Sequence, residues 1–207
     1  MPNNQRRQSD FSGKQTRYFP SIKTGLTFKL DSEAERTAAK YLEFDDNVIS
    51  YRAQPASVKP DPNKPLSRYT VDFGVLLFDK TKELRELKMD YQFDDPDVSL
   101  RLDKVDERLM MRYGQKLVRW KYSDIDKGSM VSNLKRFYPY RRFDLTRFDL
   151  KKVGKHLRTV QTLDDLFGVV SHFNAPPSFA FALLAQKKVV FDFECEFVPS
   201  TPVEVNL

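Results

Sequence analysis

Apolar and polar residues alternate with a period of two in the segments that we predict as strands. Residues 69–78 form one aromatic, β-branched and aliphatic run, a second run covers 84–88, and only polar residues separate them. Two such runs joined by a short polar turn are typical of an antiparallel hairpin. The same alternation predicts shorter strands at 26–30, 48–52 and 117–120.

Helical periodicity, with apolar residues at every third or fourth position, separates these strands. A helix is predicted to begin at Ser32, because Ser32 and Glu35 have the spacing of a capping box. A second helix is predicted over 95–113 and ends at Gly114, and a third covers about 130–138. Strand, helix, strand and hairpin in this order predict a mixed α/β sheet flanked by helices.

Residues 144–207 are predicted to form a separate small domain. Helical patterns cover 150–157 and 163–173, and a third helix follows Pro176-Pro177. The segments 189–193 and 196–198 then alternate as a small hairpin. Helices followed by a two-stranded wing are typical of a winged helix, which binds either DNA or protein.

The polar, basic residues 1–17 predict a flexible tail, so the main domain is expected to span 18–143. Within it, residues 56–68 carry three prolines and are expected to form a loop or a loosely paired edge.

Composition narrows the class of protein. The chain has 207 residues, of which 40% are apolar and 13% aromatic, so it can bury a real core. Only 7 residues are glycine and no G-x-G-x-x-G or Walker A pattern is present, which argues against a glycine-rich nucleotide loop. A net charge of +6 favours a polyanionic partner.

Cysteine and histidine are too rare for several kinds of site. Cys195 is the only cysteine, which excludes a disulfide framework and a thiolate zinc site. His156 and His172 are the only histidines, which disfavours histidine metal sites and Ser-His-Asp hydrolysis. No apolar run approaches the length of a bilayer span and no signal peptide is evident. We therefore expect a soluble, cytoplasmic protein with no membrane partner.

The hairpin carries the candidate chemistry. Its turn is expected to bring Asp72 back towards Glu86, and Glu86 and Lys88 point to the same side because side chains alternate along a strand. Two carboxylates can hold a hard divalent cation, with the lysine beside the metal-bound water. The alternative is an ordinary ion pair on a solvated strand face. Glu35 is either a helix cap or an extra metal ligand, and its spacing favours the cap.

Basic and aromatic residues interleave after the third predicted helix. Such a stripe suits a phosphate backbone, because arginine forks match phosphate oxygens. The alternative is a helix end that buries its rings and leaves its arginines in water. The candidate DNA-binding residues are Lys135, Arg136, Arg141 and Arg142.

With these residues laid out, the chain resembles the TnsA family, the endonuclease subunit of cut-and-paste transposons whose transposase is built from two different proteins. Val71 stands where the family usually has a proline, at a position that ligates nothing. The resemblance spans most of residues 19–142 and is carried by Phe19-Pro20-Ser21-Ile22-Lys23, Ser32-x-x-Glu35, Leu42-Glu43-Phe44-Asp45, Val48, Gln54-Pro55, Tyr69-Thr70-x-Asp72-Phe73, Glu86-x-Lys88 and Asn133-Leu134-Lys135.

This resemblance implies a restriction-endonuclease-like core and a Mg²⁺-dependent cut of the non-transferred strand at the 5′ ends of the element. Glu35, Asp72 and Glu86 would be the acids and Lys88 the catalytic lysine. The carbonyl of Leu87 would be a further metal ligand, and Mn²⁺ is expected to substitute for Mg²⁺. The implied partners are double-stranded DNA at transposon ends, an integrase-fold transposase and an AAA+ ATPase regulator.

Two other functions fit the same residues. A stand-alone restriction- or resolvase-type nuclease would cut DNA with Mg²⁺ alone, whereas a TnsA-like subunit needs its transposase. A non-catalytic DNA-binding adaptor of the transposition machinery would bind no metal at these acids.

Overall fold

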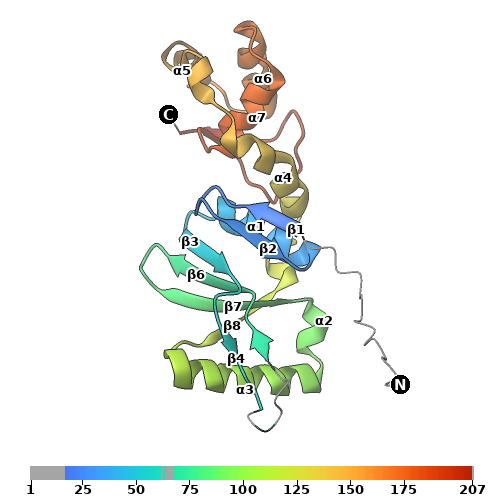
Figure 1. The fold of residues 1–207 in the computed structure, drawn as a ribbon. Coiled ribbons are helices and arrows are strands. Elements are labelled where there is room, and N and C mark those ends of the chain that lie inside the picture. Colours follow the sequence, from blue (N-terminus) through green and yellow to red (C-terminus); the bar gives the residue numbers. More distant parts are fainter. Residues whose placement is uncertain (1–16, 62, 64–67, 207) are drawn as a thin grey trace, which may run out of the picture.

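The computed structural model describes residues 17–61, 63 and 68–206. Its centre is a four-stranded mixed sheet of order β3-β6-β7-β8 (Figure 1). The predicted hairpin is confirmed as the antiparallel pair of β6 and β7, and β8 runs parallel to β7. The bounds of these strands are β3 (Val48–Ala53), β6 (Phe73–Leu77), β7 (Lys82–Lys88) and β8 (Leu117–Lys121).

Two pairs of short antiparallel strands flank this sheet. β1 (Arg17–Pro20) pairs with β2 (Thr27–Leu30), and β4 (Ser57–Val58) pairs with β5 (Tyr69–Thr70). Within 56–68, expected to be a loop or a loosely paired edge, β4 forms a short paired edge, and its partner β5 is the start of the run 69–78, which is therefore two strands and not the single predicted arm. Arg17 belongs to β1, although it was assigned to the tail, and the rest of that predicted tail lies outside the described residues.

The helices begin and end close to where the pattern predicts. The Ser32 hydroxyl accepts a hydrogen bond from the Glu35 N–H at 3.1 Å, and Gly114 ends the second helix in the left-handed region at φ 65°. None of the described helices has the length and apolar character needed to cross a membrane. The α-helices are α1 (Glu33–Phe44), α2 (Asp90–Phe93), α3 (Pro96–Tyr113), α4 (Met130–Phe137), α5 (Leu150–Leu157), α6 (Leu163–His172) and α7 (Pro177–Ala185).

Helices cover both faces of the sheet (Figure 1). Leu87 belongs to the large apolar core that includes α1, whereas Leu84 packs with Leu109 of α3 in a smaller core. Because side chains alternate along β7, Glu86 and Lys88 share the face of Leu84. Glu86 and Lys88 therefore lie on the α3 side of the sheet, whereas Glu35 belongs to α1.

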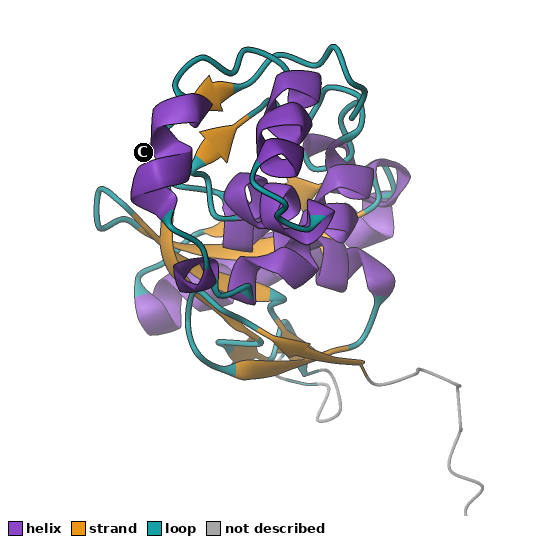
Figure 2. Ribbon diagram, turned by 90° about the horizontal axis from the view of Figure 1, so that it is seen from above, coloured by secondary structure: helices purple, strands orange, loops and turns teal. Residues whose placement is uncertain are grey.

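The large core continues from the sheet into the C-terminal helices. Seen from above, helices lie over the strands of the sheet (Figure 2). The Phe137 ring of α4 packs against Phe181 of α7 at a centroid distance of 5.9 Å, and both belong to the cluster that contains Phe73. Packing of α4 thus joins the C-terminal helices to the sheet.

The predicted hairpin between 189–193 and 196–198 is wrong. β9 (Val189–Val190) pairs instead with β10 (Glu204–Val205). Three aromatic rings cause the difference, because Phe191, Phe193 and Phe197 all pack around Phe137. The chain turns between these rings. Residues 189–190 therefore pair with residues 204–205 and not with 196–198.

Candidate active site

The hairpin brings Asp72, Glu86 and Lys88 together, as the sequence predicts. Asp72 precedes β6 and lies across from β7, where its Oδ2 accepts a hydrogen bond from the Leu87 N–H at 2.9 Å. The Lys88 ammonium donates to Glu86 Oε1 and, at 3.3 Å, to the Leu87 carbonyl. Two carboxylates, one carbonyl and one amine thus share one end of the hairpin.

Glu86 is a buried carboxylate with one unsatisfied oxygen. Its residue is 1% exposed, and its Oε1 accepts from Lys88 and, at 2.5 Å, from the Tyr69 hydroxyl. Its Oε2 is buried and has no hydrogen-bond partner among the residues that the structure describes. A buried anionic oxygen without a donor is costly, unless a cation is bound beside it.

The pKa of Asp72 is raised to about 8, chiefly by burial and then by the nearby charge of Glu86. Lys88 and the Leu87 N–H oppose this shift, and Glu35 adds a smaller upward effect. Two carboxylates that lie close together in a buried site cannot both ionise readily. A divalent cation would remove this repulsion.

Because the pKa of Asp72 is raised, the free energy of unfolding is expected to depend on pH. A pKa raised from 3.8 to about 8 means that the folded protein binds this proton more tightly than the unfolded chain does. The protonated carboxyl stabilises the fold fully below about pH 4, and this contribution is lost as pH rises through about 8. The side chain of Asp72→Asn cannot ionise, so the stability of this variant relative to the wild type is expected to grow by roughly 5 kcal/mol between about pH 4 and pH 9.

Urea denaturation across this pH range, in EDTA, measures that difference. Added Mg²⁺ is expected to stabilise the wild type at high pH and to leave Asp72→Asn unchanged. A difference between the two proteins that does not vary with pH would contradict the raised pKa.

The oxygen atoms at this site fit a hard cation. Carboxylates and carbonyls are the ligands that Mg²⁺ prefers, and the unpartnered Glu86 oxygen is free to take one. In the part of the chain that the structure describes, no three acidic, histidine or cysteine side chains gather closely enough to hold an ion. The candidate protein ligands are therefore the carboxylates of Asp72 and Glu86, with the Leu87 carbonyl beside them.

Glu35 uses both carboxylate oxygens to cap α1. Its Oε1 accepts from the Ser32 hydroxyl and its Oε2 from the Asp31 N–H, each at 2.9 Å. The cap that the spacing favours is confirmed. Its charge still raises the pKa of Asp72, so Glu35 lies within electrostatic reach of the hairpin carboxylates. Its role as a metal ligand stays a prediction.

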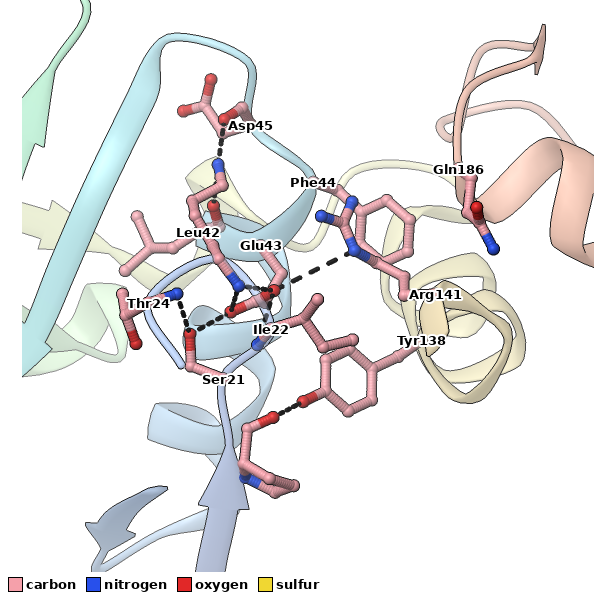
Figure 3. Close-up of polar contacts among 12 residues, drawn as sticks. Ser21, Ile22, Thr24, Leu42, Glu43, Phe44, Asp45, Tyr138, Arg141 and Gln186 are labelled. Carbon is pink, nitrogen blue, oxygen red and sulfur yellow. Dashed lines mark hydrogen bonds and ion pairs between the residues drawn. The ribbon is translucent and has the colours of Figure 1, made fainter. Parts of the chain in front are cut away.

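The four candidate DNA-binding residues lie along α4 and the 3₁₀ turn Tyr138–Arg142 that follows. Lys135, Arg136 and Arg142 are exposed, and the Arg136 guanidinium lies 4.6 Å from the Phe197 ring centre. Arg141 is half-buried, with its Nε 4.0 Å from a Glu43 oxygen and its guanidinium over the Phe44 ring (Figure 3). Their contact with DNA stays a prediction.

Glu43 is a second buried carboxylate, and it joins three segments of the chain (Figure 3). It accepts hydrogen bonds from the Ser21 hydroxyl, from the backbone N–H of Lys23 at 3.1 Å and from the Tyr51 hydroxyl at 2.8 Å. The Lys23 ammonium in turn donates to two carbonyls at the end of α1 and to the Val48 carbonyl at the start of β3, and burial lowers its pKa to about 8. Two segments of the TnsA-like string, 19–23 and 42–45, therefore meet at a structural network.

Sequence reasoning assigned no role to Tyr69 or to a basic hollow beside it. Tyr69 carries no signal of its own, because only the fold shows that its hydroxyl reaches Glu86. The hollow had a partial signal, since Arg101, Arg108 and Arg112 recur on one face of a predicted helix. Its remaining basic residues are Lys59, which follows β4, and Arg68, which precedes β5.

No protein-family model matches the chain, and a search of curated proteins finds no match either. The proposal below therefore depends on the geometry of the site and on the resemblance of its motifs.

Proposed function

We propose that this protein is a Mg²⁺-dependent DNA endonuclease, the subunit of a heteromeric transposase that cuts the non-transferred strand at the 5′ ends of a transposon. The observation that carries the proposal is the hairpin site itself. Asp72 and Glu86 converge there, Lys88 contacts Glu86, and one buried Glu86 oxygen has no partner. A site of this composition suits phosphodiester hydrolysis.

The proposal also assigns a fold type to each part of the chain. We infer a restriction-endonuclease-like core from the mixed sheet, the flanking helices and the acids at the end of the β6–β7 hairpin. The helices α5, α6 and α7, followed by the β9–β10 pair, support a winged-helix unit.

Asp72, Glu86 and the Leu87 carbonyl would hold Mg²⁺, Glu35 would act on the site through its charge, and Mn²⁺ would substitute. When bound, the ion supplies Lewis-acid activation of water and of the scissile phosphate. Lys88 places a positive charge beside Glu86, where it offsets the negative charge that develops on the phosphate oxygens.

Tyr69 orients the ion pair of Glu86 and Lys88. Its hydroxyl donates to the same Glu86 oxygen that Lys88 contacts, which leaves the second Glu86 oxygen available to a cation. Burial raises the pKa of Tyr69 well above its usual range, so the hydroxyl keeps its proton and remains a donor. Because Tyr69 lies on β5, it also ties the β4–β5 pair to the catalytic hairpin.

The proposed partners follow from the resemblance and from charge. The exposed Lys135, Arg136 and Arg142 suit double-stranded DNA at the transposon ends. An integrase-fold transposase would select those ends, and an AAA+ ATPase regulator would contact the C-terminal unit.

Strand-resolved cleavage tests the proposal. Transposon-end duplexes labelled on either strand are incubated with Mg²⁺ and this protein, with and without an integrase-fold transposase encoded next to it. We expect 5′-end cleavage only when both proteins are present. Efficient cutting without the transposase would indicate a stand-alone nuclease, and no cutting under either condition would indicate an adaptor.

A further inference from the structure

A basic hollow lies between α3 and the β4–β5 strand pair. Its volume is about 440 Å³. Among the described residues that line it, none is acidic. The lining residues are Lys59, Arg68, Arg108 and Arg112, together with Ser57, Val58 and Met111.

The four cations of this hollow lack anionic partners in the described part of the chain. Among the described residues, Arg112 donates to the Ser57 carbonyl at 3.4 Å and lies over the Tyr113 ring, and Arg108 donates to the Met111 sulfur at 3.9 Å. No ion pair in that part of the chain involves Lys59 or Arg68. Like charges that converge without counter-charges favour binding of an anion.

A row of arginines connects the hollow to the catalytic hairpin. Arg101, Arg108 and Arg112 lie on one face of α3, because residues seven and eleven positions apart nearly eclipse on a helix. At the near end, the Arg101 guanidinium lies 4.9 Å from the centre of the Tyr69 ring, whose hydroxyl contacts Glu86. From Arg101 to Arg112 the helix rises about 16 Å, which matches roughly five base pairs of duplex.

We propose that this row and hollow bind the sugar-phosphate backbone of duplex DNA next to the scissile phosphate. The inference rests on the proposed nuclease function, because the row begins at the catalytic side chains. A small anion would occupy the hollow alone, whereas a DNA backbone also uses Arg101. The surface lies on the α3 face of the sheet, which is the face that carries Glu86 and Lys88.

The test is the salt dependence of DNA binding by the full chain. Fluorescence anisotropy with a labelled duplex of about 30 base pairs gives the slope of log affinity against log salt. Two double variants, Lys59→Gln/Arg68→Gln and Arg108→Gln/Arg112→Gln, remove two charges from opposite walls. Each is expected to weaken binding about tenfold or more and to reduce the magnitude of the slope by about 2.

The matched control is Lys151→Gln/Lys155→Gln, which removes the same charge from α5, at the opposite end of the molecule from α3 (Figure 1). It is expected to keep the wild-type slope. The variants on β4–β5 guard against misfolding of the α3 variants, and thermal melting checks each protein.

The outcomes separate this inference from the nuclease proposal. A wild-type slope in both hollow variants overturns the inference alone. If both hollow variants keep the wild-type slope for DNA but lose binding to phosphatidylserine vesicles, the hollow binds a membrane surface. This outcome also overturns the inference. Absence of DNA binding by the wild-type chain overturns the inference alone, because the nuclease proposal is tested by cleavage in the presence of the transposase.

Discussion

Asp72→Ala and Lys88→Ala are each expected to abolish cleavage at the 5′ ends of the transposon, a loss of about a thousandfold or more. Removal of Asp72 takes away one of two carboxylates that converge on the proposed ion. Removal of Lys88 leaves Glu86 without its cationic partner and the reacting phosphate without a nearby positive charge. The measurement is strand-resolved cleavage of end-labelled duplex in the presence of the transposase, in which 3′-strand nicking is expected to remain intact.

Lys151→Ala is the control for this result. Asp149-Leu150-Lys151 has the same acid-x-Lys spacing as Glu86-Leu87-Lys88, but Asp149 caps α5 by accepting from the Lys151 N–H at 3.1 Å. Lys151→Ala is therefore expected to cut like the wild type. Double-strand breaks at the wild-type rate from Asp72→Ala would exclude the hairpin as the catalytic site.

Glu43→Ala is expected to lower the free energy of unfolding by about 3–5 kcal/mol. The substitution removes the acceptor that the Tyr51 hydroxyl, the Ser21 hydroxyl and the half-buried Arg141 share. Removal of one partner from a buried network leaves the others desolvated and unpaired. Chemical denaturation measures the loss.

Glu107→Ala provides the comparison, because Glu107 is an exposed glutamate on α3. Its effect is expected to stay within about 0.5 kcal/mol, as for most surface substitutions. An effect of similar size from Glu43→Ala would show that the network in Figure 3 does not hold the segments together.

Several residues of the TnsA-like string have structural contacts. Asn133 donates two hydrogen bonds, to the carbonyls of Phe193 at 3.0 Å and Cys195 at 2.9 Å. The Gln54 N–H donates to the Asp72 carbonyl at 2.8 Å, which fixes the backbone at the entry to β6. These contacts position the β6–β7 hairpin and the C-terminal unit, while Asp72, Glu86 and Lys88 remain the candidates for chemistry.

Local patterns predicted most elements of the fold. The cap at Ser32, the stop at Gly114 and the β6–β7 hairpin each depend on residues close in sequence, so the sequence was sufficient to place them. The hairpin register also predicted that Asp72 would meet Glu86, because side-chain alternation fixes which residues share a face.

Features that depend on distant segments could not be predicted in this way. The prediction of a strand at 196–198 is wrong because Phe197 packs against Phe137, which is distant in the sequence, and that contact overrides local alternation. The Tyr69–Glu86 hydrogen bond and the basic hollow need β4–β5 and α3 to lie together. The arginines of α3 can be read from the sequence, but the segments that they face in the fold cannot.

Calorimetric titration with Mn²⁺ tests the central claim most directly, because it measures the site without partner proteins or DNA. We expect the wild type to bind Mn²⁺, Mg²⁺ to compete for the same site, and Asp72→Asn and Glu86→Gln each to lose the heat of binding. Equal heats from the wild type and both variants would show that these carboxylates do not hold the ion, and would contradict the proposed nuclease.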